Sequence, residues 1–471
     1  MNPSAETHLW TSETAIAATR GCGAPDWRAD GVTIDSRDVI SGDLFIAIKG
    51  PRFDGHQFTA DALAAGAVCA VVDHRPGALG AEAPLLEVND TMTALEDLGR
   101  AARARTAAKV IAVTGSVGKT GTKEALRFVL EDQAPSMASR GSFNNHWGVP
   151  LSLSRMPADT AFGVFEIGMN HPGEITPLTK MVRPDVAIIT NVENVHSAYF
   201  DSIEAIADAK AEIFAGLNDG GVAILNRDND QYDRLKVAAG RAGVKSIVGF
   251  GVHPQAQARA IDIRADSEGS DINAVICGHE IHYRLGQPGR HWVMNSLAVL
   301  AAVDAVGGDV GRAAAELAGM HGLKGRGQRH TVTLPGGDFV VIDESYNASP
   351  ASMRAALEVL GQMQPAGKGR RIAVLGDMLE LGEQSGARHA ELAKTLIAEK
   401  IDLVFTAGKY MDALWSDLSE SMRGGCAPTS EGVLAQVTGA VRPGDVIVVK
   451  GSARSNTGPI VEALLALPDK G

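Results

Sequence analysis

The sequence predicts an α/β protein of three domains: a small α/β domain, a central domain with a parallel sheet, and a C-terminal Rossmann-like domain. Three observations support this prediction. The chain has 471 residues, too many for one compact core. Apolar strand-like runs alternate with helix-like stretches in two separate blocks, and a glycine-rich basic stretch divides these blocks. We expect domain boundaries at 1–88, 89–325 and 326–471.

Composition restricts the class of function. Hydrophobic residues make up 45% and charged residues 21%, as in ordinary globular proteins. A net charge of −12 argues against a nucleic-acid partner, which would require a basic face. No CxxC pair is present and no secretory signal or run of about 18 apolar residues is visible, so we expect a cytoplasmic protein with reduced thiols and no membrane span. The cysteines are Cys22, Cys69, Cys277 and Cys426.

The first domain, 1–88, contains short apolar runs at 44–48 and 67–72, separated by turn signals such as Asp-Gly pairs. We interpret it as a small α/β unit. The stretch 90–107 has helical spacing and an exposed basic face, which is typical of a connecting helix.

The central domain shows βαβ alternation, which predicts a parallel sheet covered on both faces. The predicted strands are 109–114, 162–168, 185–191 and 221–226, and the predicted helices are 122–131, 174–182 and 201–217. We interpret 256–285 as antiparallel strands that decorate this domain. A nearly all-apolar helix follows at 291–306.

The C-terminal domain begins after a glycine-rich, basic stretch at 322–330, which we interpret as a hinge. Its predicted strands are 338–344, 370–376, 401–408 and 445–451. No GxGxxG follows the first of these strands, so we expect no dinucleotide site there.

The stretch VTGSVGKTGT, 113–122, predicts a phosphate-binding turn. It lies between a strand and a helix, where glycines let backbone N–H groups approach phosphate oxygens and the helix N-terminus adds positive charge. Lys119 would reach the terminal phosphates and Thr120 would ligate Mg²⁺. Val113 stands where the full Walker signature has its first glycine.

The alternative interpretation of 113–122 is a glycine-rich turn with a solvated lysine. The predicted phosphate contacts are Gly115, Ser116, Val117, Gly118, Lys119 and Thr120.

Lys210 lies on the apolar face of the predicted helix 201–217, because residues three and four positions away are apolar. No carboxylate stands at those positions to pair with it. Burial of an unpaired ammonium is costly and lowers its pKa, and a neutral amine is nucleophilic and open to modification. The alternative is that its head group snorkels to an edge of the helix.

Polar residues follow two strands of the central domain. Glu166 lies near the end of 162–168 and His196 follows 185–191. If these strands are parallel neighbours, both residues would meet Thr120 at one edge of the sheet. Oxygen and imidazole ligands of this kind suit Mg²⁺ or Mn²⁺. Taken singly, the glutamate could instead be a cap and the histidine an ordinary loop residue.

Five further positions carry candidate polar groups. Asn144 and Asn145 lie in FNNHWGVP, a turn sequence, and Asn295 faces His291 one turn earlier on the apolar helix. Asp343 and Tyr346 follow a C-terminal strand, where an aspartate is often only a helix cap.

These residues, in this order, resemble the Mur ligase family of ATP-dependent amide-forming enzymes, over nearly the whole chain. The resemblance implies a UDP-binding N-terminal domain, a central P-loop-type ATPase domain and a Rossmann-like C-terminal domain. The family's phosphate loop also lacks the first Walker glycine. By resemblance, Glu166 and His196 bind metal, and Lys210 is carried as a carbamate, which would turn a buried cation into an anion that faces Mg²⁺.

Four stretches are most similar to the branch of the family that adds D-alanyl-D-alanine to UDP-N-acetylmuramoyl-tripeptide: TIDSRDVISGDLFIAIKGPRFDGHQF, SFNNHWGVP, VIDESYNASPASM and AVLGDMLELG. The resemblance implies uridine diphosphate contacts from Asp35, Ser36 and Arg37, and muramoyl-peptide contacts from Asn144 and Asn145. It implies nucleotide contacts from Asn295, Arg326, Asp343 and Tyr346. The family's KGSR reads KGSAR here, which leaves the roles of Lys450 and Arg454 toward the dipeptide open.

The resemblance implies two Mg²⁺ ions and small-molecule substrates, and we expect a monomer. A related alternative is folylpolyglutamate synthase, but that relative lacks the N-terminal DSR and DGHQF segments. A P-loop kinase or GTPase switch is a second alternative, and NKxD is absent. A catalytically dead binding module is a third.

Overall fold

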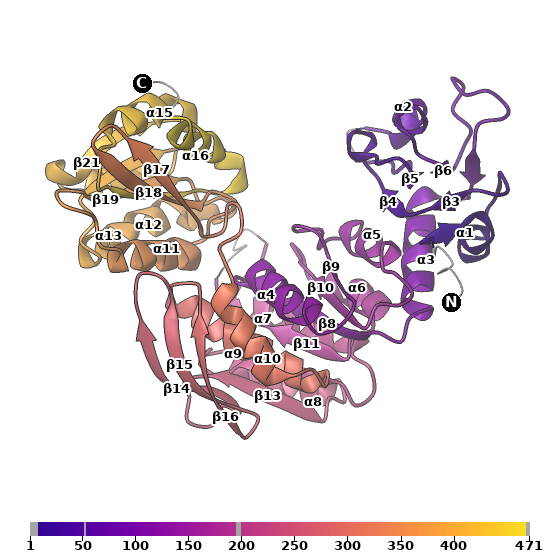
Figure 1. Ribbon diagram of the computed structural model, residues 1–471, viewed down its shortest axis with the longest axis horizontal. Helices are drawn as coiled ribbons and strands as arrows, with labels where there is room; N and C mark the ends of the chain where they lie inside the picture. The colour runs from indigo at the N-terminus through magenta and orange to yellow at the C-terminus, as the bar shows by residue number, and fades with distance from the viewer. Residues whose placement is uncertain (1–7, 51–52, 195–198, 468–471) are drawn as a thin grey trace.

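The computed structural model describes residues 8–50, 53–194 and 199–467. Its three large sheets lie in three lobes that follow one another along the chain (Figure 1). The N-terminal lobe, in indigo, and the C-terminal lobe, in yellow and orange, stand on opposite sides of the central lobe. The predicted α/β class is confirmed. The boundaries at residues 88 and 325 stay a prediction.

The N-terminal lobe contains a five-stranded sheet, parallel except for its edge strand β2. In spatial order its strands are β2 (Cys22–Gly23), β7 (Leu85–Glu87), β6 (Cys69–Val72), β5 (Asp43–Ile46) and β4 (Gly31–Thr33). A small antiparallel pair and three helices complete this region: β1 (Trp10–Thr11), β3 (Arg28–Ala29), α1 (Ser12–Thr19), α2 (Thr59–Ala64) and α3 (Thr91–Ala104). The last helix is the predicted connector, and its apolar face joins the core of this lobe.

The central lobe is built on a nine-stranded sheet, in which seven adjacent strands pair with one another in parallel. In spatial order its strands are β9 (Ser136–Ala138), β10 (Phe162–Glu166), β8 (Lys109–Thr114), β11 (Val186–Ile189), β12 (Val222–Asn226), β13 (Ser246–Gly251), β14 (Ala258–Ala265), β15 (Ser270–Ile276) and β16 (His279–Leu285). The predicted antiparallel strands at 256–285 are confirmed, but they are not a separate decoration. Since β14 pairs with β13 through Phe250 and Ala258, they extend the same sheet.

Successive residues of the central strands enter two different cores, as the alternation of side chains along a strand requires. Ile111 and Val113 pack with one core and Val110 and Ala112 with the other. The first core is covered by α4 (Lys119–Glu131), α9 (Arg290–Ala305) and α10 (Val310–Glu316). The second is covered by α5 (Gly148–Ser154), α6 (Ile175–Val182), α7 (Ile203–Ala211) and α8 (Tyr232–Arg241). The prediction of a sheet covered on both faces is confirmed.

The C-terminal lobe contains a six-stranded sheet, parallel except for β17 at one edge. In spatial order its strands are β17 (Gln328–Leu334), β18 (Gly337–Glu344), β22 (Val446–Lys450), β19 (Arg371–Gly376), β20 (Leu403–Ala407) and β21 (Arg423–Ala427). Its helices are α11 (Pro350–Gln362), α12 (Ser385–Ala390), α13 (Leu392–Ala398), α14 (Met411–Asp417), α15 (Ser430–Ala440) and α16 (Gly458–Leu465). The predicted hinge at 322–330 therefore runs into a strand, since β17 pairs with β18 from Gln328 onward.

Among the described helices, none combines the length and the apolar character that crossing a bilayer requires.

Candidate active site

The turn between β8 and α4 adopts a conformation that its glycines permit. Gly115 and Gly118 have φ angles of +149° and +85°, which side chains other than glycine rarely adopt. The turn is held from the next strand, because Ser116 donates its backbone N–H to Asn191 O at 2.8 Å. Helix α4 then begins at Lys119 with no side-chain cap. The first N–H groups of a helix have no partner within the helix, so this uncapped terminus is suited to an anion.

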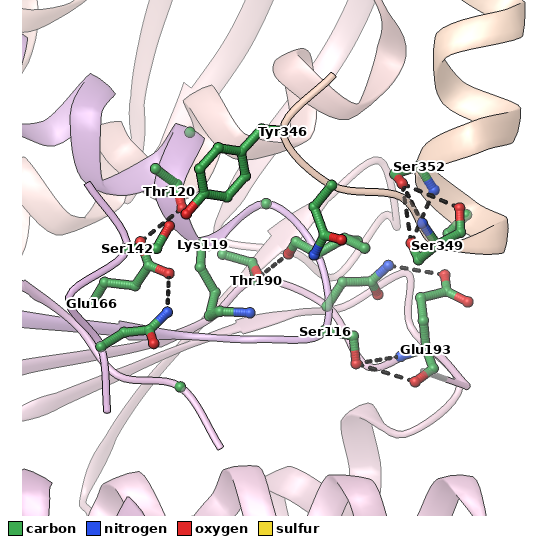
Figure 2. A pocket seen from close by; sticks show the side chains of 18 of the residues that line it. Ser116, Lys119, Thr120, Ser142, Glu166, Thr190, Glu193, Tyr346, Ser349 and Ser352 are labelled. Atoms are coloured by element: carbon green, nitrogen blue, oxygen red, sulfur yellow. Dashed lines mark hydrogen bonds between the residues drawn. The ribbon is translucent and has the colours of Figure 1, made fainter. Parts of the chain in front are cut away.

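Lys119 lies in the wall of the cleft beside this turn (Figure 2). Its Nζ donates to Gly115 O at 2.8 Å, so the side chain folds back onto the glycine-rich turn. Burial lowers the pKa of Lys119, the charge of Glu166 opposes that shift, and the charge of Arg326 adds to it. The ammonium therefore lies within electrostatic reach of a carboxylate and a guanidinium.

Glu166 is 1% exposed and is held by residues from two other segments. Thr120 Oγ1 donates to its Oε2 at 2.8 Å, and Asn144 Nδ2 donates to its Oε1 at 2.7 Å. The predicted meeting of Thr120 and Glu166 at one edge of the sheet is therefore confirmed. His196, the third member of the predicted set, lies outside the described residues.

Lys210 lies in α7 and is 2% exposed, so the prediction that it is on the buried face of its helix is confirmed and snorkelling is not observed. Burial lowers its pKa well below the usual value, and the charge of Lys119 adds to that effect. Among the described residues, its ammonium has neither an ion-pair partner nor a hydrogen-bond acceptor. Burial and the nearby charge of Lys119 therefore both favour the neutral amine of Lys210.

The C-terminal lobe adds residues to the opposite wall of the cleft. The Arg326 guanidinium lies 4.0 Å from the ring centre of Tyr346, and its Nη2 donates to Ser142 Oγ at 3.2 Å. Asn295, on α9, lies against the glycine-rich turn, since a Cβ added to Gly118 would be 3.1 Å from its Oδ1. Asn295, Arg326 and Tyr346, three of the predicted nucleotide contacts from both lobes, therefore line one cleft together with Lys119.

Asp343 differs from the other predicted nucleotide contacts. It is 3% exposed, and its carboxylate accepts hydrogen bonds from the Gly325 N–H at 2.9 Å and from the Ser345 N–H and hydroxyl at 3.1 and 2.6 Å. It does not line the cleft. In this conformation it organises the turns that carry Arg326 and Tyr346.

The predicted substrate residues are divided between two places. Asn144 and Asn145 line the cleft, although Asn145 also caps a turn by accepting the Gly148 N–H at 2.9 Å. Asp35, Ser36 and Arg37 lie in the N-terminal lobe and do not line the cleft. There the Arg37 guanidinium is 2.5 Å from the Asp35 carboxylate, which keeps the pKa of that carboxyl low.

Lys450 and Arg454, whose roles the sequence left open, both line the cleft. The Lys450 Nζ donates to Glu344 Oε2 at 3.1 Å and to Asn347 O at 2.9 Å. The Lys450 ammonium is therefore paired with a carboxylate at the end of β18 and bound by the turn that follows this strand. Arg454 follows in a short 3₁₀ turn, Ala453–Ser455.

The cleft has a volume of about 1550 Å³ and is lined by residues of the central and C-terminal lobes, together with Glu96 and Arg100 of α3. Sequence reasoning noted His291 only as a neighbour of Asn295, and it proposed neither His291 nor Glu344 as part of this wall. Burial lowers the pKa of His291, and the charge of Glu344 opposes that shift. The position of His291 one turn before Asn295 on the same helix is the signal that could have found it.

An uncapped helix N-terminus beside a buried carboxylate, in a cleft between two parallel-sheet lobes, is suited to binding the phosphates of a nucleotide. The chain belongs to the Mur ligase family. Models of the Mur ligase family catalytic domain, the Mur ligase middle domain and the Mur ligase glutamate ligase domain match residues 28–103, 113–303 and 325–453, respectively.

Individual relatives agree with the family assignment. The UDP-N-acetylmuramoyl-tripeptide–D-alanyl-D-alanine ligase of Rickettsia prowazekii is 33% identical over 96% of this chain and 99% of its own length. The ligase of the same name from Bacillus subtilis is 38% identical over 80% of each chain. A crystal structure of MurF from Acinetobacter baumannii superposes with a TM-score of 0.83 at 32% identity, covering 97% of this chain and 98% of that one. MurF ligase from Thermotoga maritima in complex with ADP superposes with a TM-score of 0.78 at 26% identity, covering 93% and 98%.

Proposed function

We propose that this protein is an ATP-dependent ligase that forms the amide bond between UDP-N-acetylmuramoyl-tripeptide and D-alanyl-D-alanine during cytoplasmic synthesis of peptidoglycan precursors. The observation that carries the proposal is the uncapped start of α4, with Lys119 and the Thr120–Glu166 pair beside it. Relatives that carry this name match almost the full length of the chain.

The proposed reaction has two steps. A carboxylate oxygen of the tripeptide attacks the γ-phosphorus of ATP, the bond to the bridging oxygen breaks, and ADP leaves. The amine of D-alanyl-D-alanine then attacks the acyl carbon, phosphate leaves with the carbon–oxygen electron pair, and the nitrogen loses a proton as the amide forms. Phosphoryl transfer of this kind depends on positioning and on neutralisation of charge more than on a protein nucleophile.

We assign the phosphates of ATP to the turn from Gly115 to Thr120. Residues 116–120 line the cleft at the start of α4. The Lys119 Nζ, which donates to the Gly115 carbonyl, would turn to a phosphate oxygen. Asn295, Arg326 and Tyr346 would contact the rest of the nucleotide from the other wall, with Asp343 in a supporting position behind them.

The residues at this edge fit Mg²⁺. The Thr120 hydroxyl and the Glu166 carboxylate are hard oxygen donors that already lie 2.8 Å from each other. We propose these two groups and His196 as ligands of one ion and carbamylated Lys210 as a ligand of a second. Bound Mg²⁺ would neutralise negative charge on the transferring phosphoryl group.

Carbamylation of Lys210 would account for a lysine that is buried without a described partner. The neutral amine, favoured by burial, would attack CO₂, form an N–C bond and release one proton. The product is an anion in place of a buried cation that has no described partner. The change in charge therefore removes a repulsion from Lys119 and creates an oxygen ligand for metal.

The two ends of the UDP substrate would be bound by different lobes. We propose that Asp35, Ser36 and Arg37 contact the uridine diphosphate, and that Asn144 and Asn145 contact the peptide in the cleft. Lys450 and Arg454 lie on the wall where the dipeptide would approach. Closure of the lobes would then exclude water from the acyl phosphate.

The test is phosphate release from ATP with each combination of substrates, with the product mass determined. We expect release only when UDP-N-acetylmuramoyl-tripeptide and D-alanyl-D-alanine are both present, and a product heavier by one dipeptide less one water. Separate assays with diaminopimelate and with lysine as the third residue would identify the natural tripeptide. Phosphate release at the same rate with and without D-alanyl-D-alanine would indicate a nucleotide switch and contradict the proposal.

A further inference from the structure

Lys123 is a second lysine of α4, one turn beyond the phosphate-binding turn. Although it is a charged residue, its side chain is fully buried, with 0% exposure. It does not line the cleft and so has no direct access to substrate. A fully buried ammonium is rare in proteins unless it is paired, so its partners reveal what it does.

The Lys123 ammonium has three acceptors for its three N–H groups. Nζ donates to Ser139 O at 2.7 Å and to Gly141 O at 2.8 Å, and it lies 2.6 Å from Glu124 Oε1. Two of these acceptors are backbone carbonyls of one segment that is distant in sequence. The lysine therefore fastens that segment, residues 139–145, to the helix that begins at the phosphate-binding turn.

The segment 139–145 needs such support. It follows β9, which is the edge strand of the central sheet, is only three residues long and pairs with β10 on one side. Gly141 has a φ angle of +52°, and no atom lies within 4 Å of a Cβ placed there, so the segment makes an open turn at this point. The ammonium supplies hydrogen bonds to carbonyl groups of this segment that come from α4 and not from a neighbouring strand.

The same segment holds the candidate metal ligand Glu166. Ser139, whose carbonyl binds Lys123, accepts the Glu166 backbone N–H on its hydroxyl at 3.2 Å. Asn144 donates to the Glu166 carboxylate at 2.7 Å, and its carbonyl accepts the Gly168 N–H at 2.8 Å. A movement of residues 139–145 would therefore displace the carboxylate of Glu166 and the amide of Asn144 together.

We propose that Lys123 is a positioning residue, which fastens residues 139–145 to α4 so that Asn144 orients Glu166 toward Thr120 and the bound metal. Lys123 thereby couples the geometry of the metal site to the helix that holds the phosphates. The inference rests on the proposed function for its consequence in catalysis. The coupling itself concerns metal binding and can be measured without ligation.

The test compares Lys123→Met with the wild-type chain and with Lys236→Met, a matched control at an exposed lysine of α8. Binding of Mn²⁺ in the presence of ADP is measured by electron paramagnetic resonance, and hydrogen exchange is measured over residues 136–147. We expect Mn²⁺ to bind about 10-fold more weakly in Lys123→Met, as is usual for loss of a group that orients a metal ligand. We also expect faster exchange in residues 136–147 and neither change in the control.

A double-mutant cycle with Asn144→Ala identifies the route of the effect. If Lys123 acts through Asn144, the Mn²⁺ affinity of the double variant equals that of the weaker single variant. Wild-type Mn²⁺ affinity in folded Lys123→Met, or two losses that simply multiply, would overturn the proposal.

Lys123→Met removes the donor from the buried Ser139 carbonyl and from the Gly141 carbonyl, and this loss could prevent folding. A second variant therefore tests the proposal with the lysine in place. Glu124→Gln keeps the lysine but removes the charge of its third partner, and Glu124 is partly exposed. We expect a smaller loss of Mn²⁺ affinity in the same direction, and an unchanged affinity would again overturn the proposal. A wild-type chain that binds Mn²⁺ and ADP but forms no amide would contradict the proposed function and leave this inference standing.

Discussion

Two helices begin at the wall of the same cleft, and their first turns differ. Helix α4 starts after Gly118 with no side-chain cap. Helix α11 starts after Ser349, whose hydroxyl accepts the Ser352 N–H while the Ser352 hydroxyl accepts the Ser349 N–H. The first N–H groups of α11 are thus partly satisfied within the protein, whereas those of α4 are left for a ligand.

Both lobes alternate strands with helices, but the turn before α4 is built to bind a ligand and the turn before α11 is built to fix the helix. Glycine at the start of α4 removes both the side chain that would cap the helix and the Cβ that would obstruct a phosphate. Serine and proline at the start of α11 fix its first turn in place. The following variants test this comparison, from the largest expected effect to the smallest.

Lys119→Ala should have the largest effect. It removes the cationic side chain that donates to the Gly115 carbonyl, so we expect amide formation to fall by about 10³-fold, the upper range for loss of one group that stabilises a transition state. Binding of the UDP substrate, measured by calorimetry, should survive. Substantial turnover in this variant would contradict the role of the α4 turn.

Lys210→Ala should reduce turnover by about 10²-fold, as expected for loss of a metal ligand or its supporting group. Short carboxylic acids added to the assay should restore part of the activity, because they can occupy the space of the proposed carbamate. The matched control is Lys236→Ala at an exposed site. Full activity without added acid would mean that Lys210 has only a structural role.

Gly118→Ala tests the open start of α4 directly. An alanine at φ +85° is strained by about 1–2 kcal/mol, and its Cβ would lie 3.1 Å from Asn295 Oδ1. We expect ATP to bind about 10-fold more weakly, which corresponds to about 1.4 kcal/mol. Titration calorimetry with ATP gives the affinity, and an unchanged affinity would argue that the phosphates bind elsewhere.

Ser349→Ala should have the smallest effect on the reaction and a measurable effect on stability. Loss of the capping box should lower the free energy of unfolding by about 1 kcal/mol, measured by denaturant titration. The affinity for ATP should not change. A loss of ATP affinity as large as that of Gly118→Ala would remove the distinction between the two helix starts.

The sequence predicted the elements that carry the chemistry better than it predicted the edges of the sheets. The strand predicted at 109–114 coincides with β8, because its apolar run ends at the glycines. The buried face of Lys210 followed from helical spacing alone. By contrast, β17 and β21 went unrecognised, since edge strands with polar or glycine residues lack a clear apolar pattern.

The surroundings of individual side chains were harder to predict, because they depend on contacts between distant segments. Asp343 was expected to contact the nucleotide, and in the structure its carboxylate accepts hydrogen bonds from the backbone N–H groups of Gly325 and Ser345. Lys123 was not singled out, because its partners are backbone carbonyls at Ser139 and Gly141, which no side-chain pattern reveals. His196 lies outside the described residues, and its role as a ligand stays a prediction.

The central claim is that ATP bound at the start of α4 phosphorylates the carboxylate of the peptide. It is tested most directly with UDP-N-acetylmuramoyl-tripeptide labelled with ¹⁸O in both oxygens of its terminal carboxyl group. Mass spectrometry of the phosphate released in the complete reaction should find one ¹⁸O atom, transferred from the carboxylate through the acyl phosphate. Unlabelled phosphate, with amide product formed, would contradict the account.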